Sequence, residues 1–239
     1  MPRPTRIQYE NAFYHVMNRG RGRMTIYPNE NYYQAFLETL EEAWSRFDAV
    51  IHAYCLMGNH YHLLIETPRA NLDRIMRHIN GVYTQRYNRL KHTDGPLFRG
   101  RYKAILVDRD GYLLSLSRYI HRNPIETKSK LVNTLSDWRW SSYPAYINQT
   151  VAPAWLHRET TYRMLGQRQR YNGYRRSLDA VHDSIVIAVV NNELTVKRLY
   201  KRNGRIELRP DNPAYPIIQL DKEMELIIWG VVSGVTRKL

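Results

Sequence analysis

The order of two hydrophobic patterns over the first 120 residues limits the fold more than any other feature of this sequence. Alternating apolar residues predict four strands, at residues 13–20, 49–58, 60–68 and 102–108. Helical spacing predicts two long helices, at residues 29–48 and 72–91. Asn29 is a suitable N-cap for the first helix, whose predicted apolar stripe is Tyr33, Phe36, Leu37, Leu40 and Trp44. The Gly58-Asn59 pair predicts a hairpin turn between the second and third strands.

This element order is that of a ferredoxin-like antiparallel sheet with both long helices on one face. A third helix, at residues 111–121, follows the last strand. We expect it to cover the open face of the sheet and to end before Pro124, because proline disrupts a helix interior. Residues 136–178 are aromatic and basic and predict short helices and loops that extend a binding surface. The predicted fold class is therefore α+β.

Positive charge is concentrated in the first three quarters of the chain. The whole chain has 36 Lys and Arg against 22 Asp and Glu, and residues 1–180 account for 27 and 15 of these, a net charge of +12. Of the 27 basic residues 23 are Arg, and 17 of the 19 Tyr lie in the same stretch. Arg binds phosphate and Tyr rings stack on bases, so this composition favours a single-stranded nucleic-acid partner over a basic surface without one.

Composition also excludes several classes of protein. With 43% apolar and 24% charged residues, the chain is neither a disordered tail nor a fibre. No apolar run is long enough to cross a membrane and no apolar stretch follows the basic start, so we expect a cytoplasmic protein without a membrane partner. Cys55 is the only cysteine, so any metal must rest on His, carboxylate or amide ligands.

Two short motifs carry the chemistry. His60 and His62 flank Tyr61 at the start of a strand, so their imidazoles project from one face, about 7 Å apart, and can share a cation. Two solvated histidines on a sheet would show the same spacing. Tyr119 and Asn123 are one helical turn apart in the third helix and share a face. A hydroxyl and an amide oxygen therefore point together toward whatever that helix covers.

These motifs resemble those of a known family. MGNHYHLLIE resembles the HUH motif of single-tyrosine DNA transposases, and YIHRNP resembles the tyrosine motif of their REP-associated branch. FYHVMNRG, GPLFRGRYKAILVD and DWRWSSY are further matches, and the resemblance covers about residues 5–178. The sequence departs from the family at Gly58, where proline is more common, and at Tyr61, where an aliphatic residue is usual. Neither departure removes a ligand.

The resemblance implies an HUH endonuclease fold and a transposase that cleaves and rejoins single-stranded or hairpin DNA. It implies that Tyr119 is the nucleophile and that His60, His62 and Asn123 bind Mg²⁺ or Mn²⁺, with positions left for phosphate oxygen and water. Attack would leave a 5′-phosphotyrosine and a free 3′-OH, and a second 3′-OH could reverse the step. The protein is expected to act as a monomer or a homodimer.

Other polar residues have plainer expected roles. Tyr83 and Tyr87 on the second long helix are expected to pack or to contact the DNA backbone. Structural, hydrogen-bonded roles are expected for three more histidines, His15, His52 and His121. A supporting or general-base role stays open for two carboxylates, Glu66 and Asp108.

From residue 180 onward, strand-like runs separated by turn sequences predict a small all-β segment. The predicted domains are therefore 1–178 and 180–239. The second resembles the C-terminal half of the self-cleaving UmuD/LexA-type peptidase domain, in which Lys197 matches the general base of a Ser-Lys dyad. Ser184 is too close in the chain to Lys197 to replace the missing serine, which implies a truncated domain without peptidase activity. The alternative function is a non-catalytic DNA-binding regulator whose tail recruits a repair or SOS partner.

Overall fold

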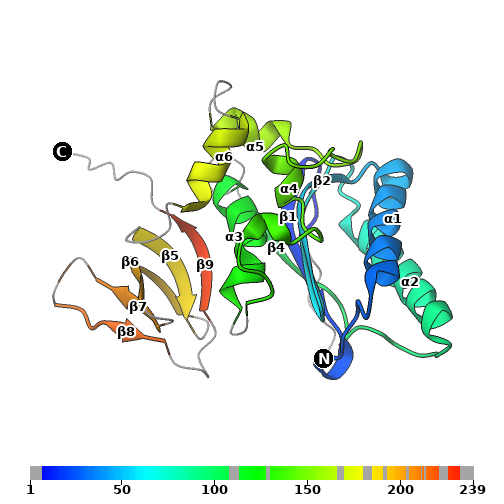
Figure 1. Ribbon diagram of the computed structural model, residues 1–239, viewed down its shortest axis with the longest axis horizontal. Helices are drawn as coiled ribbons and strands as arrows, with labels where there is room; N and C mark the ends of the chain where they lie inside the picture. Colours follow the sequence, from blue (N-terminus) through cyan, green and yellow to red (C-terminus); the bar gives the residue numbers. More distant parts are fainter. Residues whose placement is uncertain are drawn as a thin grey trace.

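The computed structural model describes most of the chain in two β-sheet units (Figure 1). The residues described are 7–107, 113–127, 130–165, 170–179, 185–190, 193–202, 205–210, 212, 214–220 and 226–231. Two of the residues singled out in the sequence, Asp108 and Ser184, lie outside these ranges.

The first sheet has the predicted strands in the predicted arrangement. Its strands are β1 (Ala12–Arg19), β2 (Val50–Met57), β3 (His60–Thr67) and β4 (Lys103–Val107). All neighbours are antiparallel and the order across the sheet is β2-β3-β1-β4, which is the ferredoxin-like order. The predicted α+β fold is therefore confirmed.

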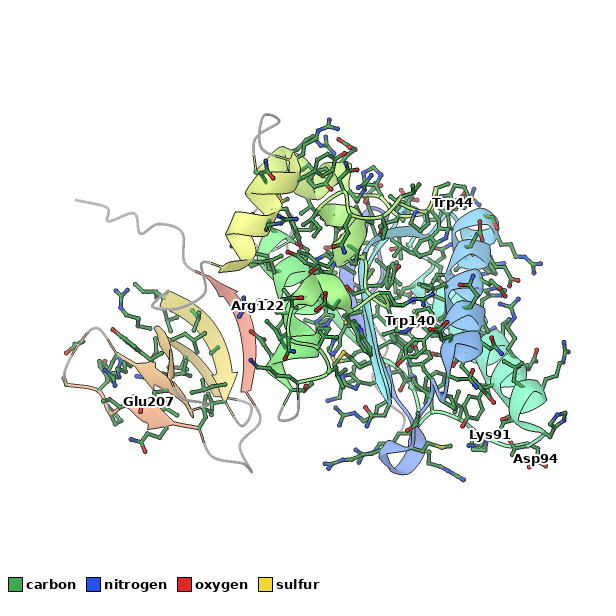
Figure 2. The ribbon with its side chains drawn as sticks, viewed as in Figure 1. Trp44, Lys91, Asp94, Arg122, Trp140 and Glu207 are labelled. Atoms are coloured by element: carbon green, nitrogen blue, oxygen red, sulfur yellow. The ribbon has the colours of Figure 1, made fainter. Side chains whose placement is uncertain are left out.

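Two helices cover one face of this sheet, α1 (Glu30–Phe47) and α2 (Leu72–Lys91) (Figure 1). Asn29 caps α1 as predicted, because its side chain accepts a hydrogen bond from the Asn31 amide. Phe36 and Leu40 are fully buried in the layer between these helices and the sheet. Trp44 is the exception to the predicted stripe: it is 40% exposed at the outer end of α1 (Figure 2).

The opposite face is covered by α3 (Leu113–Glu126), which contacts β2 and β3. The expectation that this helix ends before Pro124 was wrong, because Pro124 lies inside it. Proline has no N–H to give to the Ile120 carbonyl, one turn earlier. The Asn123 side chain supplies a replacement: its Nδ2 donates to the carbonyls of Tyr119 at 2.9 Å and Ile120 at 3.4 Å. The helix therefore continues past the proline.

Between residues 135 and 179 the described residues include four short helices beside α3, as expected. They are η2 (Leu135–Asp137), α4 (Tyr143–Tyr146), α5 (Glu159–Met164) and α6 (Arg170–Asp179). Their buried aromatic rings form a cluster of their own: Tyr143, Tyr146, Tyr162 and Tyr174. The cluster also includes Leu178, so α6 packs with the first unit.

A second, five-stranded antiparallel sheet follows, as predicted for the tail. Its strands are β5 (Ile185–Val190), β6 (Glu193–Arg202), β7 (Arg205–Arg209), β8 (Ile218–Gln219) and β9 (Leu226–Val231), in the order β8-β7-β6-β5-β9. The edge strand β9 lies against α3, on the side away from the first sheet (Figure 1). Lys197 on β6 is largely buried, with its ammonium 5.5 Å from the centre of the Tyr215 ring. No helix among the described residues is long and apolar enough to span a membrane.

Candidate functional site

Three imidazoles gather on the face of the first sheet that α3 covers. His60 and His62 lie on β3, two residues apart, and project from this face together as strand alternation predicts. His15 lies on the neighbouring strand β1, whose Met17 pairs with His62. Tyr61, between the two histidines, points to the opposite face, where its hydroxyl donates to Asn80 Oδ1 at 2.7 Å. Its aromatic side chain therefore fills the α1–α2 core and leaves the histidine face unchanged.

The proposed nucleophile lies beside these imidazoles. The Tyr119 ring approaches His15 and His62 edge-on, with 5.8 Å between ring centres in both cases. His62 and His15 are in turn stacked, with His15 Nε2 and His62 Nδ1 3.0 Å apart. The His60 ring centre is 5.1 Å from that of His62. The structure thus brings His60, His62 and Tyr119 into one cluster.

Burial keeps these imidazoles neutral. Desolvation, with a smaller contribution from the charge of Arg19, lowers the pKa of His60 to about 4. Desolvation alone lowers the pKa of His15 to about 4. The pKa of His62 is held well below its usual value by desolvation and by the neighbouring imidazoles. The neutral imidazole is the form that binds metals.

Hydrogen bonds also set which ring nitrogen of each histidine is available. The side-chain nitrogen of Asn59 donates to the Arg23 carbonyl, so Asn59 Oδ1, 2.7 Å from His60 Nδ1, accepts a hydrogen bond from that nitrogen. Neutral His60 therefore presents its Nε2 lone pair. Likewise, Nδ1 of His62 is engaged by His15 Nε2 at 3.0 Å, so Nε2 is the ring nitrogen of His62 that this contact leaves available. Such partners orient the metal-binding histidines of known proteins, so the donor set fits a divalent cation.

Asn123, the third ligand predicted from the sequence, lies one turn after Tyr119 on α3. No group of three or more His, Cys, Asp or Glu side chains within the described ranges could hold a metal ion. The amide of Asn123 is oriented by the two helix carbonyls that its Nδ2 binds. Its Oδ1 is the atom that remains to act as a ligand. Pro124 contributes indirectly, because it has no N–H to give to the Ile120 carbonyl that Asn123 Nδ2 binds.

The expected structural role of His15 is confirmed, but the sequence did not identify its partner. A structural, hydrogen-bonded histidine was expected, and His15 is buried and hydrogen-bonded, but its partner is the candidate ligand His62. A signal existed: in an antiparallel pair, residues at matching positions of β1 and β3 share a face. This rule can be applied to His15 and His62 only once β1 and β3 are known to be neighbours.

The other residues considered lie elsewhere. Tyr83 and Tyr87 are buried in the α1–α2 layer, which confirms packing. His52 bonds to Glu66 at 2.9 Å at the far end of β3, so this carboxylate is occupied away from His60. His121 is fully buried in a hydrogen-bond network on the other side of α3, as a structural residue should be.

Two loops beside the histidines carry exposed arginines. One follows β1 and the other precedes β4, and they are joined by hydrogen bonds from the Arg21 amide to the Leu97 carbonyl and from the Arg99 amide to the Arg19 carbonyl, both 2.9 Å. Gly20 is required here, because a Cβ would lie 2.3 Å from the Met24 carbonyl oxygen. We call the exposed arginines at the end of β1 and on these two loops the arginine rim: Arg19, Arg21, Arg23, Arg99 and Arg101. Among the described residues none of the five forms an ion pair.

A basic rim beside a buried histidine pair and a tyrosine is a site suited to phosphodiester chemistry on nucleic acid. Comparison with protein families agrees at the level of the domain. Residues 8–123 match the family described as "Transposase IS200 like", and residues 173–233 match the family "Peptidase S24-like". The chain therefore contains a region similar to IS200-like transposases, followed by a region similar to S24-like peptidases.

Individual relatives show the same division. The solved "Structure of the REP associates tyrosine transposase bound to a REP hairpin" matches 66% of this chain and 92% of its own, with a TM-score of 0.54 and 16% identity, which shows a shared fold. LexA repressors from Syntrophotalea carbinolica and Pelotomaculum thermopropionicum are 48% and 45% identical over 64 and 65 residues, about 26% and 27% of this chain. The chain spans about a third of the length of these repressors, 31% and 30%.

Proposed function

We propose that this chain is a DNA endonuclease and strand transferase that cleaves and rejoins single-stranded DNA beside a REP-like hairpin. Tyr119 is the proposed nucleophile, and His60, His62 and Asn123 are the proposed ligands of Mg²⁺ or Mn²⁺. The IS200-like match over residues 8–123 supports the class of reaction. The hairpin-bound protein of similar fold supports the kind of DNA.

One observation carries the proposal. The Tyr119 ring lies edge-on against both members of the buried His15–His62 pair, although these residues come from a helix and two different strands. Hydrophobic packing gives no reason for a tyrosine and two neutral, hydrogen-bonded imidazoles to meet at one point. A tyrosine nucleophile does need neighbours of this kind, because they can stabilise the charge that develops in the reaction.

The chain's own residues would then act as follows. The arginine rim binds DNA phosphates and draws the strand toward His60. The Tyr119 oxygen forms a bond to phosphorus as its proton leaves, the bond from phosphorus to the 3′ oxygen breaks, and that oxygen takes up a proton. A divalent cation at the proposed ligands would neutralise charge that develops on the phosphate oxygens. His15 holds the imidazole of His62 in its ligating orientation.

The direct test uses one DNA hairpin with a single-stranded foot, labelled in separate samples at either end. With Mg²⁺ or Mn²⁺, we expect the 3′-labelled fragment to migrate with the protein on a denaturing gel, because the 5′-phosphate becomes attached to tyrosine. The 5′-labelled fragment should be released with a free 3′-OH. Tight binding of the hairpin without either product would contradict the proposal and favour a non-catalytic DNA-binding regulator.

The arginine rim gives a prediction on DNA affinity. We expect Arg99→Gln with Arg101→Gln to weaken hairpin binding and to lower the slope of log affinity against log salt by about 1.4 to 1.8, because each lost phosphate contact contributes about 0.7 to 0.9. Fluorescence anisotropy at several salt concentrations measures this slope. Arg46→Gln is the control, since Arg46 is exposed on α1 on the far side of the sheet. Equal slopes for the double variant and the control would assign DNA binding to another surface.

We also propose that the chain divides into domains at residues 1–178 and 180–239. The buried Leu178 at the end of α6 and the start of the second sheet at Ile185 support this boundary. Lys197 has no proposed part in the reaction.

The domain boundary predicts that a shortened chain ending at Asp179 keeps its cleavage activity within about threefold of the full chain. The physical reason is that Tyr119 contacts the histidines of the first sheet, whereas β9 lies on the outer side of α3 (Figure 1). Lys197→Ala in the full chain is expected to leave cleavage unchanged. If the shortened chain stays folded by circular dichroism but loses cleavage, the second sheet takes part in the activity.

A further inference from the structure

A chain of buried hydrogen bonds holds α3 on the side opposite to Tyr119. His121 follows Tyr119 by two residues, which is about 200° around the helix, and it is completely buried. Both of its ring nitrogens are bonded: Nδ1 lies 2.6 Å from the Tyr174 hydroxyl and Nε2 lies 2.6 Å from Ser142 Oγ. No other histidine of the described part has both nitrogens bonded to buried side-chain hydroxyls.

One end of this network reaches the sheet. Ser142 Oγ accepts from the Tyr54 amide at 2.9 Å, and the Ser142 amide donates to the Tyr54 carbonyl at 3.0 Å. Tyr54 is followed on β2 by Cys55, which pairs with His62 across the strands. The network therefore ends on the strand next to the one that carries both candidate ligands.

The other end holds α3 at a second point. The Tyr174 hydroxyl, besides its bond to His121, donates to Ser117 Oγ at 3.0 Å. Ser117 is four residues before His121, one turn earlier on the same face of α3. A single hydroxyl from α6 thus contacts two successive turns of the helix, and a shift or rotation of α3 would break both contacts.

We propose that His121, Ser142 and Tyr174 are positioning residues that set the rotation and height of α3, so that Tyr119 stays against His62. Apolar packing tolerates small slides, but buried hydrogen bonds are directional, and an unpaired buried polar group costs about 1 to 3 kcal/mol. A shift or rotation of α3 that breaks these hydrogen bonds therefore costs free energy of that size. The inference rests on the proposed function only for the role of Tyr119 as the nucleophile.

Tyr174 lies in a part of the sequence that the transposase family does not match. Tyr174 lies outside residues 8–123, which match the transposase family, and inside residues 173–233, which match the peptidase family. In three dimensions it is completely buried against α3 and the tyrosine cluster. We infer that the first residues of the peptidase-like match serve the transposase-like site.

The test compares two buried tyrosines of the same cluster, of which only Tyr174 has a hydroxyl that the structure shows bonded to α3. Tyr174→Phe removes the hydroxyl that binds His121 and Ser117. Tyr162→Phe is the matched control, because Tyr162 is buried in the same cluster but its hydroxyl donates to the Tyr146 carbonyl at 2.8 Å. In single-turnover formation of the covalent adduct, we expect Tyr174→Phe to lower the rate by about tenfold to a hundredfold with an unchanged hairpin Kd, since a misplacement of about 1 Å can have this effect. Tyr162→Phe should stay within twofold of the parent at a similar loss in Tm.

A second readout needs no DNA. With 3-fluorotyrosine incorporated at position 119, the ¹⁹F resonance should shift and broaden in Tyr174→Phe and stay unchanged in Tyr162→Phe. If the parent protein forms no adduct, the proposed function fails, and the ¹⁹F comparison still decides the positioning role. If Tyr174→Phe does not fold, Ser142→Ala is judged by the same criteria. A folded variant that matches Tyr162→Phe in both rate and resonance would overturn the inference.

Discussion

Tyr119→Phe is expected to abolish the covalent protein–DNA adduct, with a loss of at least a thousandfold in cleavage rate. The substitution removes one oxygen, and no phosphotyrosine can form without it. Hairpin affinity should change less than twofold, because the proposed phosphate contacts come from the arginine rim, which lies outside α3. Denaturing gels with 3′-labelled hairpin measure the adduct, and anisotropy measures binding.

Tyr83→Phe is the matched control for this result. The Tyr83 ring lies on the other face of the first sheet, completely buried, and its hydroxyl donates to the Ile26 carbonyl. Burial raises the pKa of Tyr83 far above its usual value, which makes it a poor nucleophile. We therefore expect adduct formation in this variant. An adduct that persists in Tyr119→Phe would show that another tyrosine is the nucleophile.

The second large effect concerns the proposed metal ligands. His60→Ala with His62→Ala should eliminate cleavage at every Mg²⁺ or Mn²⁺ concentration, because both imidazole ligands are lost. Asn123→Ala removes one neutral ligand of three and should be rescued in part by excess Mn²⁺. Mn²⁺ binding, followed by electron paramagnetic resonance on the protein alone, should be lost in the double variant and weakened in Asn123→Ala.

His78→Ala is the matched control, because it removes an imidazole that lies outside the site. His78 lies on α2, across the sheet from the site, and bonds to Glu42 at 3.1 Å. This variant should retain both Mn²⁺ binding and cleavage. Cleavage by the parent protein that continues undiminished in EDTA would contradict the metal proposal, whatever the variants do.

Several parts of the site could be predicted from local rules. Alternation along β3 places His60 and His62 on one face whatever the strand pairs with. Helical periodicity puts Tyr119 and Asn123 one turn apart. The Gly58-Asn59 turn and the Asn29 cap also depend only on nearby residues, and both are present in the structure. Each of these features has a physical cause within a few residues of the chain.

Pro124 shows where a local rule fails. Proline predicts a helix end because one backbone carbonyl loses its partner. The side chain of Asn123 replaces the missing donor, and burial of Pro124 and Ile120 favours the continued helix. The cost of leaving the Ile120 carbonyl without a backbone donor is therefore offset by the Asn123 side chain and by packing against the rest of the molecule.

The sequence by itself determined the order of elements, the two successive β-sheets, and the shared faces of the histidine pair and of Tyr119 with Asn123, because periodicity is a local property. Only the tertiary structure decided that His15 bonds to His62, that two arginine loops meet beside His60, and that Tyr174 holds the helix of Tyr119. These contacts join residues 47 to 80 positions apart. They depend on which strands become neighbours and which helix packs on which face, and the burial of the whole core sets that choice.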